Sequence, residues 1–317
     1  MALDALTDAN FKKIAAVIDG WATLSRWPTD ATGAEFIAEL NRTEVLIGWA
    51  LPELMAASPL KVYLCGSAGM DSHLGHGLES KTGFQICNAG SIMGIPIAEH
   101  LFGLMLALTR QINVILRQQA EHRWERRWRA GELYETNVCI VGLGGSGAEL
   151  ARRCSAFNMK VTGVRRDAGK GHPGIGKVLP VSQLCDAVRD ADHVFTVIPG
   201  GTESRHLFND RVFAAMKPGA CFYSASRGSV TDEAALIRHL QSGHLGGAGL
   251  DVFESEPLPA SNPLWAMDNV IISPHSAGLS HRLPDRFCEL TCANLSRYRR
   301  SEPLLNRFDL RTMSSSR

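Results

Sequence analysis

The stretch NVCIVGLGGSGAELARRCSAF, residues 137–157, restricts the fold of this 317-residue chain more than any other. An apolar, strand-like run leads into a Gly-x-Gly-x-x-Gly turn, and an amphipathic helical pattern follows. Gly142 allows a tight turn out of the strand, Gly144 lets backbone approach a pyrophosphate, and Gly147 lets the helix pack against the strand. The amino end of that helix would offer unpaired N–H groups to phosphate oxygens. The stretch therefore predicts a dinucleotide-binding unit.

The rest of the chain repeats the same alternation of short apolar runs and helical patterns. The predicted strands are EVLIGWA, LKVYLCG, FQICNAG, NVCIVG, KVTGV, HVFTVI, ACFYSAS, LGGAGLDV and NVIISP. Helices are predicted at residues 96–124, 149–157 and 232–241, among others. Continuous apolar runs in this order are typical of parallel strands covered on both faces, which is the doubly wound α/β class.

Strands on both sides of the nucleotide turn indicate two doubly wound parallel-sheet domains. We expect a Rossmann-type dinucleotide-binding domain at residues 101–280. It would be inserted into a flavodoxin-like substrate domain made of residues 1–100 and 281–317. We expect the chemistry in the cleft between these domains.

The composition favours a soluble enzyme that acts on a small molecule. Lysine and arginine number 33 against 32 acidic residues, a net charge of +1, so no overall field would attract nucleic acid or a membrane. The first residues lack the features of a signal peptide. The longest apolar stretch, from Ile95, is interrupted by Glu99 and His100, which favours a buried helix over a membrane span.

The eight cysteines are scattered, and Cys65, Cys139 and Cys221 lie inside apolar runs. This pattern favours a reducing compartment, and we expect the cytoplasm. Cys288 and Cys292 are spaced to share a metal ion, but no other ligand cluster is near them in the sequence, so no metal is expected.

The end of the second strand departs from the common nucleotide-binding pattern. That position usually holds a carboxylate that binds both ribose hydroxyls, whereas here Arg165 and Arg166 occupy it. An arginine forms a charge-assisted pair with a 2′-phosphate, so we predict a preference for NADP(H). The alternative is that both arginines are solvated and that Asp167 binds the ribose of NAD(H).

Three loops after predicted strands carry groups suited to one reaction. Arg227 lies in SASRGSVTDEAAL, Glu256 in GLDVFESEPLP and His275 in SPHSAG. A guanidinium can hold a carboxylate, an imidazolium can donate a proton near neutral pH, and a carboxylate can steady that imidazole. Together these catalytic candidates suit the reduction of a 2-keto acid. Each also has a structural interpretation: a solvated arginine, a turn-shaping glutamate and a structural histidine.

These motifs, with GLGGSGAELARR, make the chain similar to the D-2-hydroxyacid dehydrogenase family over residues 60–309. The resemblance implies that backbone N–H groups of Ala68 and Gly69 bind the substrate carboxylate together with Arg227. It also implies that Asp251 meets the nicotinamide carboxamide and that Pro199 borders the cofactor. The residues expected to contact the cofactor are Gly142, Gly144, Gly145, Ser146, Gly147, Arg165, Arg166, Pro199, Ser226 and Asp251.

The same resemblance implies a homodimer joined through the nucleotide domain. The predicted helix from Pro96 and the segment HRWERRWRA, residues 122–130, would lie near the interface. In some glyoxylate and hydroxypyruvate reductases of this family a tryptophan enters the partner's active site, and Trp124 or Trp128 is a candidate here. The chain departs from the family in a short or missing first strand at residues 1–6 and in Gly200 and Gly201 beside the cofactor.

The sequence thus predicts an NADP(H)-preferring reductase of a small 2-keto acid, with glyoxylate or hydroxypyruvate as the expected substrate. Two alternatives stay open. One is an NAD(H)-sensing, corepressor-like binding protein of the same fold. The other is a dehydrogenase of a different small anion, such as phosphite or formate.

Overall fold

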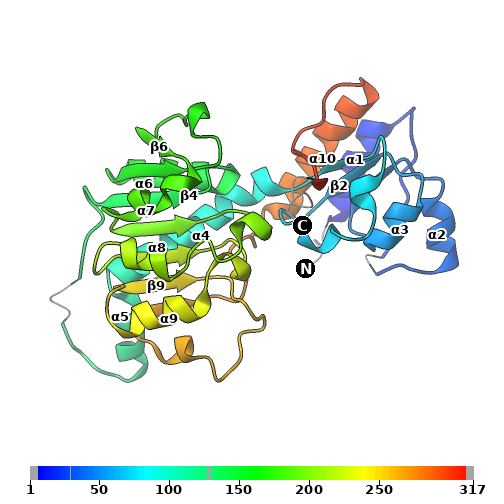
Figure 1. Cartoon of the computed structure of the whole chain (residues 1–317). Helices are drawn as coiled ribbons and strands as arrows, with labels where there is room; N and C mark the ends of the chain where they lie inside the picture. The colour runs from blue at the N-terminus through cyan, green and yellow to red at the C-terminus, as the bar shows by residue number, and fades with distance from the viewer. Residues whose placement is uncertain (1–5, 29, 127–129, 312–317) are drawn as a thin grey trace. The chain divides into compact units, whose positions relative to one another are not determined.

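The computed structural model describes residues 6–28, 30–126 and 130–311 (Figure 1). It divides the chain into two compact units. The terminal unit comprises Met1–Met93 and Ser280–Arg317, and the central unit comprises Gly94–Leu279. Both are α/β units.

The central unit is built on a parallel sheet with the strand order β10-β9-β8-β7-β4-β5-β6. The strands are β4 (Asn137–Val141), β5 (Lys160–Val164), β6 (Lys177–Leu179), β7 (His193–Thr196), β8 (Cys221–Ser224), β9 (Gly247–Leu250) and β10 (Val270–Ile272). The short strand β6 was not predicted. Because β4 pairs with both β5 and β7, the direction of winding reverses at β4. Ligands of doubly wound folds bind at the carboxyl ends of the strands beside such a switch point.

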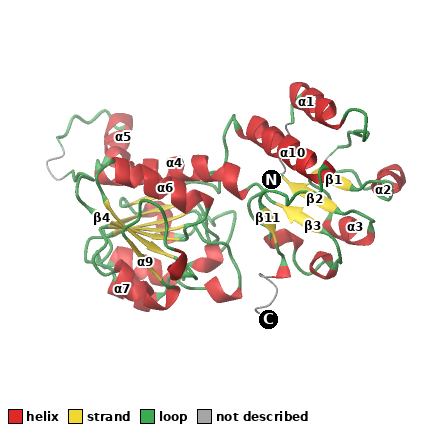
Figure 2. Cartoon of the chain, turned by 90° about the horizontal axis from the view of Figure 1, so that it is seen from above, coloured by secondary structure: helices red, strands yellow, loops and turns green. Residues whose placement is uncertain are grey.

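Helices cover both faces of this sheet (Figure 2). They are α4 (Gly90–Thr109), α5 (Ile112–Ala120), α6 (Gly145–Ala156), α7 (Leu184–Val188), α8 (Asp210–Ala215) and α9 (Glu233–Gln241). Leu101 of α4 and Leu150 of α6 share a core with Ile140 of β4. The next residue, Val141, belongs to a second core with helices α7 to α9. This alternation follows from the two-residue repeat of a strand and buries β4 on both faces.

The prediction of one helix from residue 96 to residue 124 is wrong. α4 begins earlier, at Gly90, and ends at Thr109, and α5 runs only from Ile112 to Ala120. Gln111 between them has φ 56°, a left-handed conformation that cannot continue a right-handed helix. By length and composition α4 could cross a membrane. Within the central unit, however, its residues Ala98, Leu101 and Met105 are buried in the core.

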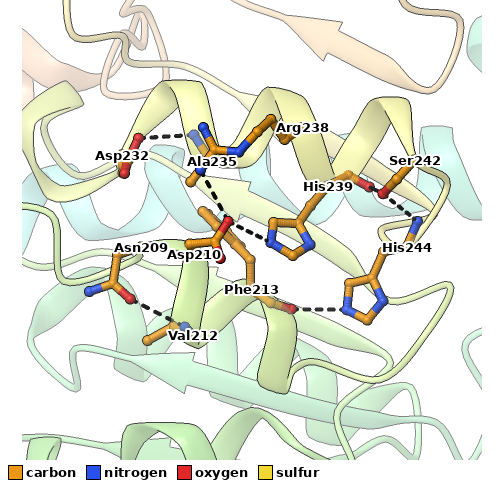
Figure 3. A network of polar contacts seen from close by, with 10 residues as sticks. All are labelled: Asn209, Asp210, Val212, Phe213, Asp232, Ala235, Arg238, His239, Ser242 and His244. Atoms are coloured by element: carbon orange, nitrogen blue, oxygen red, sulfur yellow. Dashed lines mark hydrogen bonds and ion pairs between the residues drawn. The ribbon is translucent and has the colours of Figure 1, made fainter.

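Charged side chains fasten α8 to α9 (Figure 3). Asp210 accepts hydrogen bonds from Arg238 at 3.1 Å and from His239 at 3.3 Å. The hydrogen bond from Arg238 is the main reason that the pKa of Asp210 is lowered. At the other end of α9, the side chain of Asp232 caps the helix by accepting from the N–H of Ala235 at 2.9 Å. These contacts fix the helix that follows the loop of Arg227.

The terminal unit contains a smaller sheet in the order β1-β2-β3-β11. Its strands are β1 (Val45–Gly48), β2 (Val62–Cys65), β3 (Gln85–Cys87) and β11 (Arg307–Phe308), and its helices are α1 (Asp8–Ile18), α2 (Ala34–Leu40), α3 (Pro52–Ala57) and α10 (Leu283–Arg299). The first three strands are parallel, and β11 pairs antiparallel with β3. Helices α1 and α10 contribute to one core of this unit, and α2 and α3 contribute to another. The expected first strand at residues 1–6 lies outside the described residues except for Leu6.

Candidate active site

The nucleotide turn joins β4 to α6 and accepts only glycine at two positions. Gly142 has φ 103°, and a Cβ there would lie 2.9 Å from the carbonyl oxygen of Val197. A Cβ on Gly147 would lie 1.8 Å from the oxygen of Gly142, so a side chain would separate helix and strand. At Gly144, by contrast, a Cβ would meet nothing within 4 Å. The turn is therefore tightly packed at Gly142 and Gly147 and open at Gly144.

This geometry fits a dinucleotide. Gly144, where a Cβ would have open space, is the N-cap residue of α6, and no side chain caps that helix end. Its first N–H groups, those of Gly145, Ser146 and Gly147, are the donors that a pyrophosphate requires. The turn also sits at the switch point of the sheet. These residues would hold the phosphates of a nicotinamide cofactor.

Two positively charged residues, Arg165 and Arg166, follow β5. Arg165 donates from its guanidinium to the carbonyl oxygen of Gly171 at 3.0 Å, so its position is supported by the following loop. Arg166 lies 3.7 Å from Glu203, and both side chains are about three-quarters exposed, 74% and 73%. Asp167 pairs with Lys170 at 3.3 Å. Exposed pairs of this kind contribute little to stability and leave Arg166 able to rearrange.

The loop after β8 carries Ser226 and Arg227. Ser226 is buried, and its hydroxyl lies 3.1 Å from that of Ser224. The guanidinium of Arg227 donates to the carbonyl oxygen of Ser226 at 2.8 Å. A Cβ on Gly228 would lie 1.8 Å from the oxygen of Phe253, so the backbone of this loop touches the loop after β9. The arginine loop and the loop of Glu256 are therefore direct neighbours.

The structure brings His275 and Glu256 together. Nδ1 of His275 lies 2.7 Å from Oε2 of Glu256, and the other carboxylate oxygen accepts from the N–H of Phe253 at 2.9 Å. The carboxylate is thus held at both oxygens and fixes the orientation of the imidazole. With Nδ1–H donating to Glu256, Nε2 is the ring atom left to exchange a proton with a ligand. Both side chains are partly exposed, 48% for His275 and 35% for Glu256.

Asp251 lies next to this pair but is occupied within the protein. Its carboxylate accepts from the hydroxyl of Ser273 at 2.6 Å and from the N–H groups of Ser276 and Ala277, each at 2.9 Å. A carboxylate can accept about four hydrogen bonds, so these three leave about one free position. Its contact with the nicotinamide carboxamide stays a prediction.

The substrate loop predicted at Ala68 and Gly69 follows β2 in the terminal unit. The carbonyl oxygen of Ala68 accepts from the side chain of Asn88 at 2.9 Å, and that of Ser67 accepts from the N–H of Ala89 at 2.9 Å. Within the described parts of the chain, the N–H groups of Ala68 and Gly69 have no hydrogen-bond partner. Two such donors on a braced loop fit a carboxylate.

The remaining predicted residues have different surroundings. The carbonyl oxygen of Pro199, in the loop after β7, accepts from the hydroxyl of Ser204 at 2.9 Å. Trp124 is 96% exposed, and Trp128 lies outside the described residues. Cys288 and Cys292 lie on α10, and among the described residues no group of three metal-ligating side chains is present.

Three residues that brace the candidate site were not predicted. Asn88 supports the loop of Ala68, and His100 and Ser273 lie beside Asp251, with Nε2 of His100 2.7 Å from the hydroxyl of Ser273. Their only signal in the sequence is polarity within apolar surroundings, as at His100 in the apolar run from Ile95. Polarity alone does not predict that His100 contacts Ser273, which lies 173 positions later in the chain.

A separate cavity of about 450 Å³ opens at the amino ends of strands in the central sheet. Asn137 and Lys160, at the amino ends of β4 and β5, and Lys177, at the amino end of β6, contribute to its lining. Arg227, Asp251 and His275 follow carboxyl ends of strands. This cavity is therefore distinct from the candidate active site.

Comparison with known proteins identifies the family. The model for the NAD-binding domain of D-isomer specific 2-hydroxyacid dehydrogenases matches residues 102–277, more than half of the chain. The chain belongs to this family. The D-isomer specific 2-hydroxyacid dehydrogenases are NAD(P)-dependent oxidoreductases, and the chain is accordingly an oxidoreductase of small 2-keto and 2-hydroxy acids with a nicotinamide cofactor.

Individual relatives agree with this family assignment. A glyoxylate reductase of Korarchaeum cryptofilum is 31% identical over 231 residues, covering 70% of this chain and 68% of the relative. A D-isomer specific 2-hydroxyacid dehydrogenase of Xanthobacter autotrophicus Py2, solved with NADPH and MES, has a TM-score of 0.80 at 29% identity, covering 98% and 97% of the two chains. An NADPH-dependent glyoxylate/hydroxypyruvate reductase of Sinorhizobium meliloti, solved with NADP and sulfate, has a TM-score of 0.78 at 27% identity, covering 94% and 95%.

Proposed function

We propose that this protein is an NADP(H)-preferring reductase of small 2-keto acids and that its substrate is glyoxylate or hydroxypyruvate. The observation that carries the proposal is the 2.7 Å contact between His275 and Glu256, on a loop next to that of Arg227. It supplies a steadied proton donor, and the loop of Glu256 adjoins the loop that carries a cation; reduction of a keto acid requires both groups.

Each group has a distinct role in the proposed reaction. The guanidinium of Arg227 holds the substrate carboxylate, and the N–H groups of Ala68 and Gly69 assist it. Nε2–H of His275 donates its proton to the carbonyl oxygen, which becomes the hydroxyl of the product. Glu256 accepts from Nδ1–H and stabilises the imidazolium until that proton is transferred. A bound reduced nicotinamide supplies the hydride for the carbonyl carbon.

The cofactor preference rests on Arg165 and Arg166. No carboxylate occupies the first two positions after β5, and the nearest one, Asp167, pairs with Lys170. A 2′-phosphate would offer both arginines charge-assisted hydrogen bonds, and for Arg166 these would replace a weak, exposed contact. The relatives from Xanthobacter autotrophicus and Sinorhizobium meliloti, which were solved with NADPH and NADP, support the same choice.

The choice of substrate rests on the chemistry of Arg227 and on the named relatives. The guanidinium of Arg227 suits a carboxylate. The relatives from Korarchaeum cryptofilum and Sinorhizobium meliloti are named for glyoxylate and for glyoxylate and hydroxypyruvate. Both compounds are short 2-keto acids with a carboxylate next to the reacting carbonyl.

We also propose a homodimer formed through the central unit. Ile112, Ile115 and Leu116 on α5 are 40%, 45% and 58% exposed, and Trp124 is almost fully exposed. Exposed apolar side chains that gather on one helix favour an interface. The proposal includes Trp124 as the residue that enters the partner's active site.

We propose that the enzyme is cytoplasmic because of the state of its cysteines. All eight are free thiols. Burial raises the pKa of Cys139 to about 12 and that of Cys154 to about 12, so both pack as neutral hydrophobic groups. Free thiols in such number suit a reducing compartment.

A steady-state screen tests the function directly. The purified full chain is assayed with glyoxylate, hydroxypyruvate, pyruvate and phenylpyruvate, each with NADPH and with NADH. The proposal expects the highest kcat/KM for glyoxylate or hydroxypyruvate with NADPH. Highest efficiency with NADH would contradict the cofactor preference, and absence of turnover with all four keto acids would contradict the reductase.

Light scattering tests the dimer. Leu116→Glu should convert a dimer to a monomer because the charge would be buried in the interface. Leu51→Glu, at another exposed apolar residue, serves as the control. A monomeric wild-type protein at micromolar concentration would contradict the proposal. If Trp124 reaches the partner's site, Trp124→Ala lowers kcat/KM without dissociating the dimer.

A further inference from the structure

The loop that carries His275 adopts a conformation that needs support. His275 has φ 52°, in the left-handed region that residues with a Cβ rarely adopt. Its own N–H donates to the carbonyl oxygen of Asp251 at 2.9 Å, and the next two N–H groups, of Ser276 and Ala277, donate to the Asp251 carboxylate. Three consecutive residues of the loop thus depend on one aspartate. Such a conformation persists where its surroundings fix it.

Asp251 is in turn fixed from helix α4 through Ser273. The hydroxyl of Ser273 lies 2.6 Å from Oδ1 of Asp251 and 2.7 Å from Nε2 of His100. His100 lies 173 positions before Ser273 in the chain, and its Nε2 is 3.7 Å from Oδ1 of Asp251. Asp251 is 2% exposed and Ser273 is 8% exposed, so water does not compete strongly for these contacts.

The direction of this chain of hydrogen bonds follows from counting protons. An ionised carboxylate only accepts, so the single hydroxyl proton of Ser273 is donated to Asp251. Ser273 must then accept from His100, which places a proton on Nε2 of His100. The neutral Nε2–H tautomer and the imidazolium both satisfy this requirement. The contact therefore persists whichever of these two forms His100 takes.

We infer that His100 and Ser273 are positioning residues for the proton donor. His100 donates to Ser273, Ser273 donates to Asp251, and Asp251 holds the backbone of residues 275–277 so that the imidazole of His275 meets Glu256. This inference rests on the proposed function of His275. Neither residue touches the reacting atoms in this scheme, and both act through Asp251.

Paired substitutions test the chain of hydrogen bonds. Ser273→Ala removes the hydroxyl, whereas Ser273→Thr keeps it. His100→Phe removes the donor, whereas His100→Gln keeps an amide N–H near the position of Nε2. Ser25→Ala is the matched control, because Ser25 makes a 2.5 Å hydroxyl–carboxylate bond to Glu39 in the terminal unit.

Ser273→Ala and His100→Phe should lower kcat by up to about 100-fold, the effect of a misplaced catalytic group. KM for the keto acid and the dissociation constant of NADPH should stay within about twofold, since a twofold change corresponds to only roughly 0.4 kcal/mol. Ser273→Thr and His100→Gln should recover most of kcat, and Ser25→Ala should match the wild type. An unchanged kcat in both Ser273→Ala and His100→Phe would overturn the inference. The inference would also fail if Ser273→Thr and His100→Gln lost as much kcat as Ser273→Ala and His100→Phe.

Nitrogen-15 NMR of histidine-labelled full chain gives a readout independent of turnover. We expect Nε2 of His100 to carry a proton, and we expect Ser273→Ala to shift the ring resonances of His275. A proton on Nδ1 alone in His100 would overturn the inference even if the variants failed to fold. If the wild-type enzyme reduced no keto acid while this NMR pattern held, the proposed function would fail and the inferred contacts would stand.

Discussion

Nδ1 of His275 and Oε2 of Glu256 lie 2.7 Å apart, although 19 positions separate the two residues in the chain. His275 follows β10 and Glu256 follows β9, and these strands are neighbours in one parallel sheet. The contact therefore arises from strand pairing. It turns two partly exposed side chains into an oriented acid–base pair.

His275→Asn tests the proton donor while keeping this contact. The asparagine amide can still donate to Glu256 but carries no proton that it can transfer near neutral pH. We expect kcat to fall by about 10²- to 10⁴-fold, the usual contribution of general acid catalysis. NADPH binding, followed by fluorescence titration, should not change. Turnover near that of the wild type would show that another group supplies the proton.

Arg227→Lys tests the hold on the substrate carboxylate. Lysine keeps the charge but lacks the planar pair of donors, so it binds a carboxylate at one point. We expect kcat/KM for the keto acid to fall roughly tenfold to a hundredfold, as for loss of one charge-assisted hydrogen bond. Most of the loss should appear in KM. A variant with unchanged KM would remove Arg227 from substrate binding.

Gly144→Ala and Gly147→Ala separate ligand binding from folding in one turn. A Cβ at Gly147 would overlap the oxygen of Gly142, so we expect a loss of about 3 kcal/mol or more in the free energy of unfolding. A Cβ at Gly144 has open space, so stability should change by less than about 0.5 kcal/mol. It would, however, occupy the space expected for the pyrophosphate, and affinity for NADPH should fall by about tenfold or more. Denaturant unfolding and cofactor titration of both variants check this pattern.

Arg165→Ser tests the choice of cofactor. Removing the guanidinium should raise KM for NADPH roughly tenfold to a hundredfold, because a charge-assisted hydrogen bond to the 2′-phosphate is lost. KM for NADH should change little. Arg189→Ser is the control for the loss of an arginine elsewhere in the central unit, since Arg189 forms an exposed pair with Asp186. Equal effects on both cofactors would contradict a role of Arg165 at the 2′-phosphate.

The buried His193 should make the stability of the fold sensitive to acid. It is buried on β7 with Nδ1 3.2 Å from the hydroxyl of Tyr223, and burial lowers its pKa from 6.5 to about 4. The unfolded chain therefore binds a proton at a higher pH than the folded chain does. The stability due to neutral His193 is complete above pH 6.5 and is lost as the pH falls towards 4.

The expected loss from this residue is roughly 3 kcal/mol between these two pH values. Urea unfolding of the wild type and of His193→Asn measures it. The variant should be less stable at neutral pH but show a smaller decline in acid. The partly exposed His172 offers a control in His172→Asn, which should keep the full decline. Parallel pH curves for wild type and His193→Asn would contradict the assignment.

Much of the fold could be predicted because its signals are local. Apolar runs gave the positions of β1 to β5 and β7 to β10, and the spacing of Gly142, Gly144 and Gly147 gave the turn into α6. The failures have local causes too. β6 and β11 have only three and two residues, too few for a pattern, and the break at Gln111 depends on one left-handed residue in an otherwise helical run.

The sequence by itself determined which chemical groups follow which strands, including Arg227, Glu256 and His275 after β8, β9 and β10. It did so because strand and turn propensities depend on neighbours a few positions away. Only the tertiary structure decided that Asp251 holds the loop of His275 and that His100 reaches Ser273 across 173 positions. Those contacts depend on strand order and on how α4 packs against the sheet, and no short-range pattern in the chain encodes the distance between two such side chains.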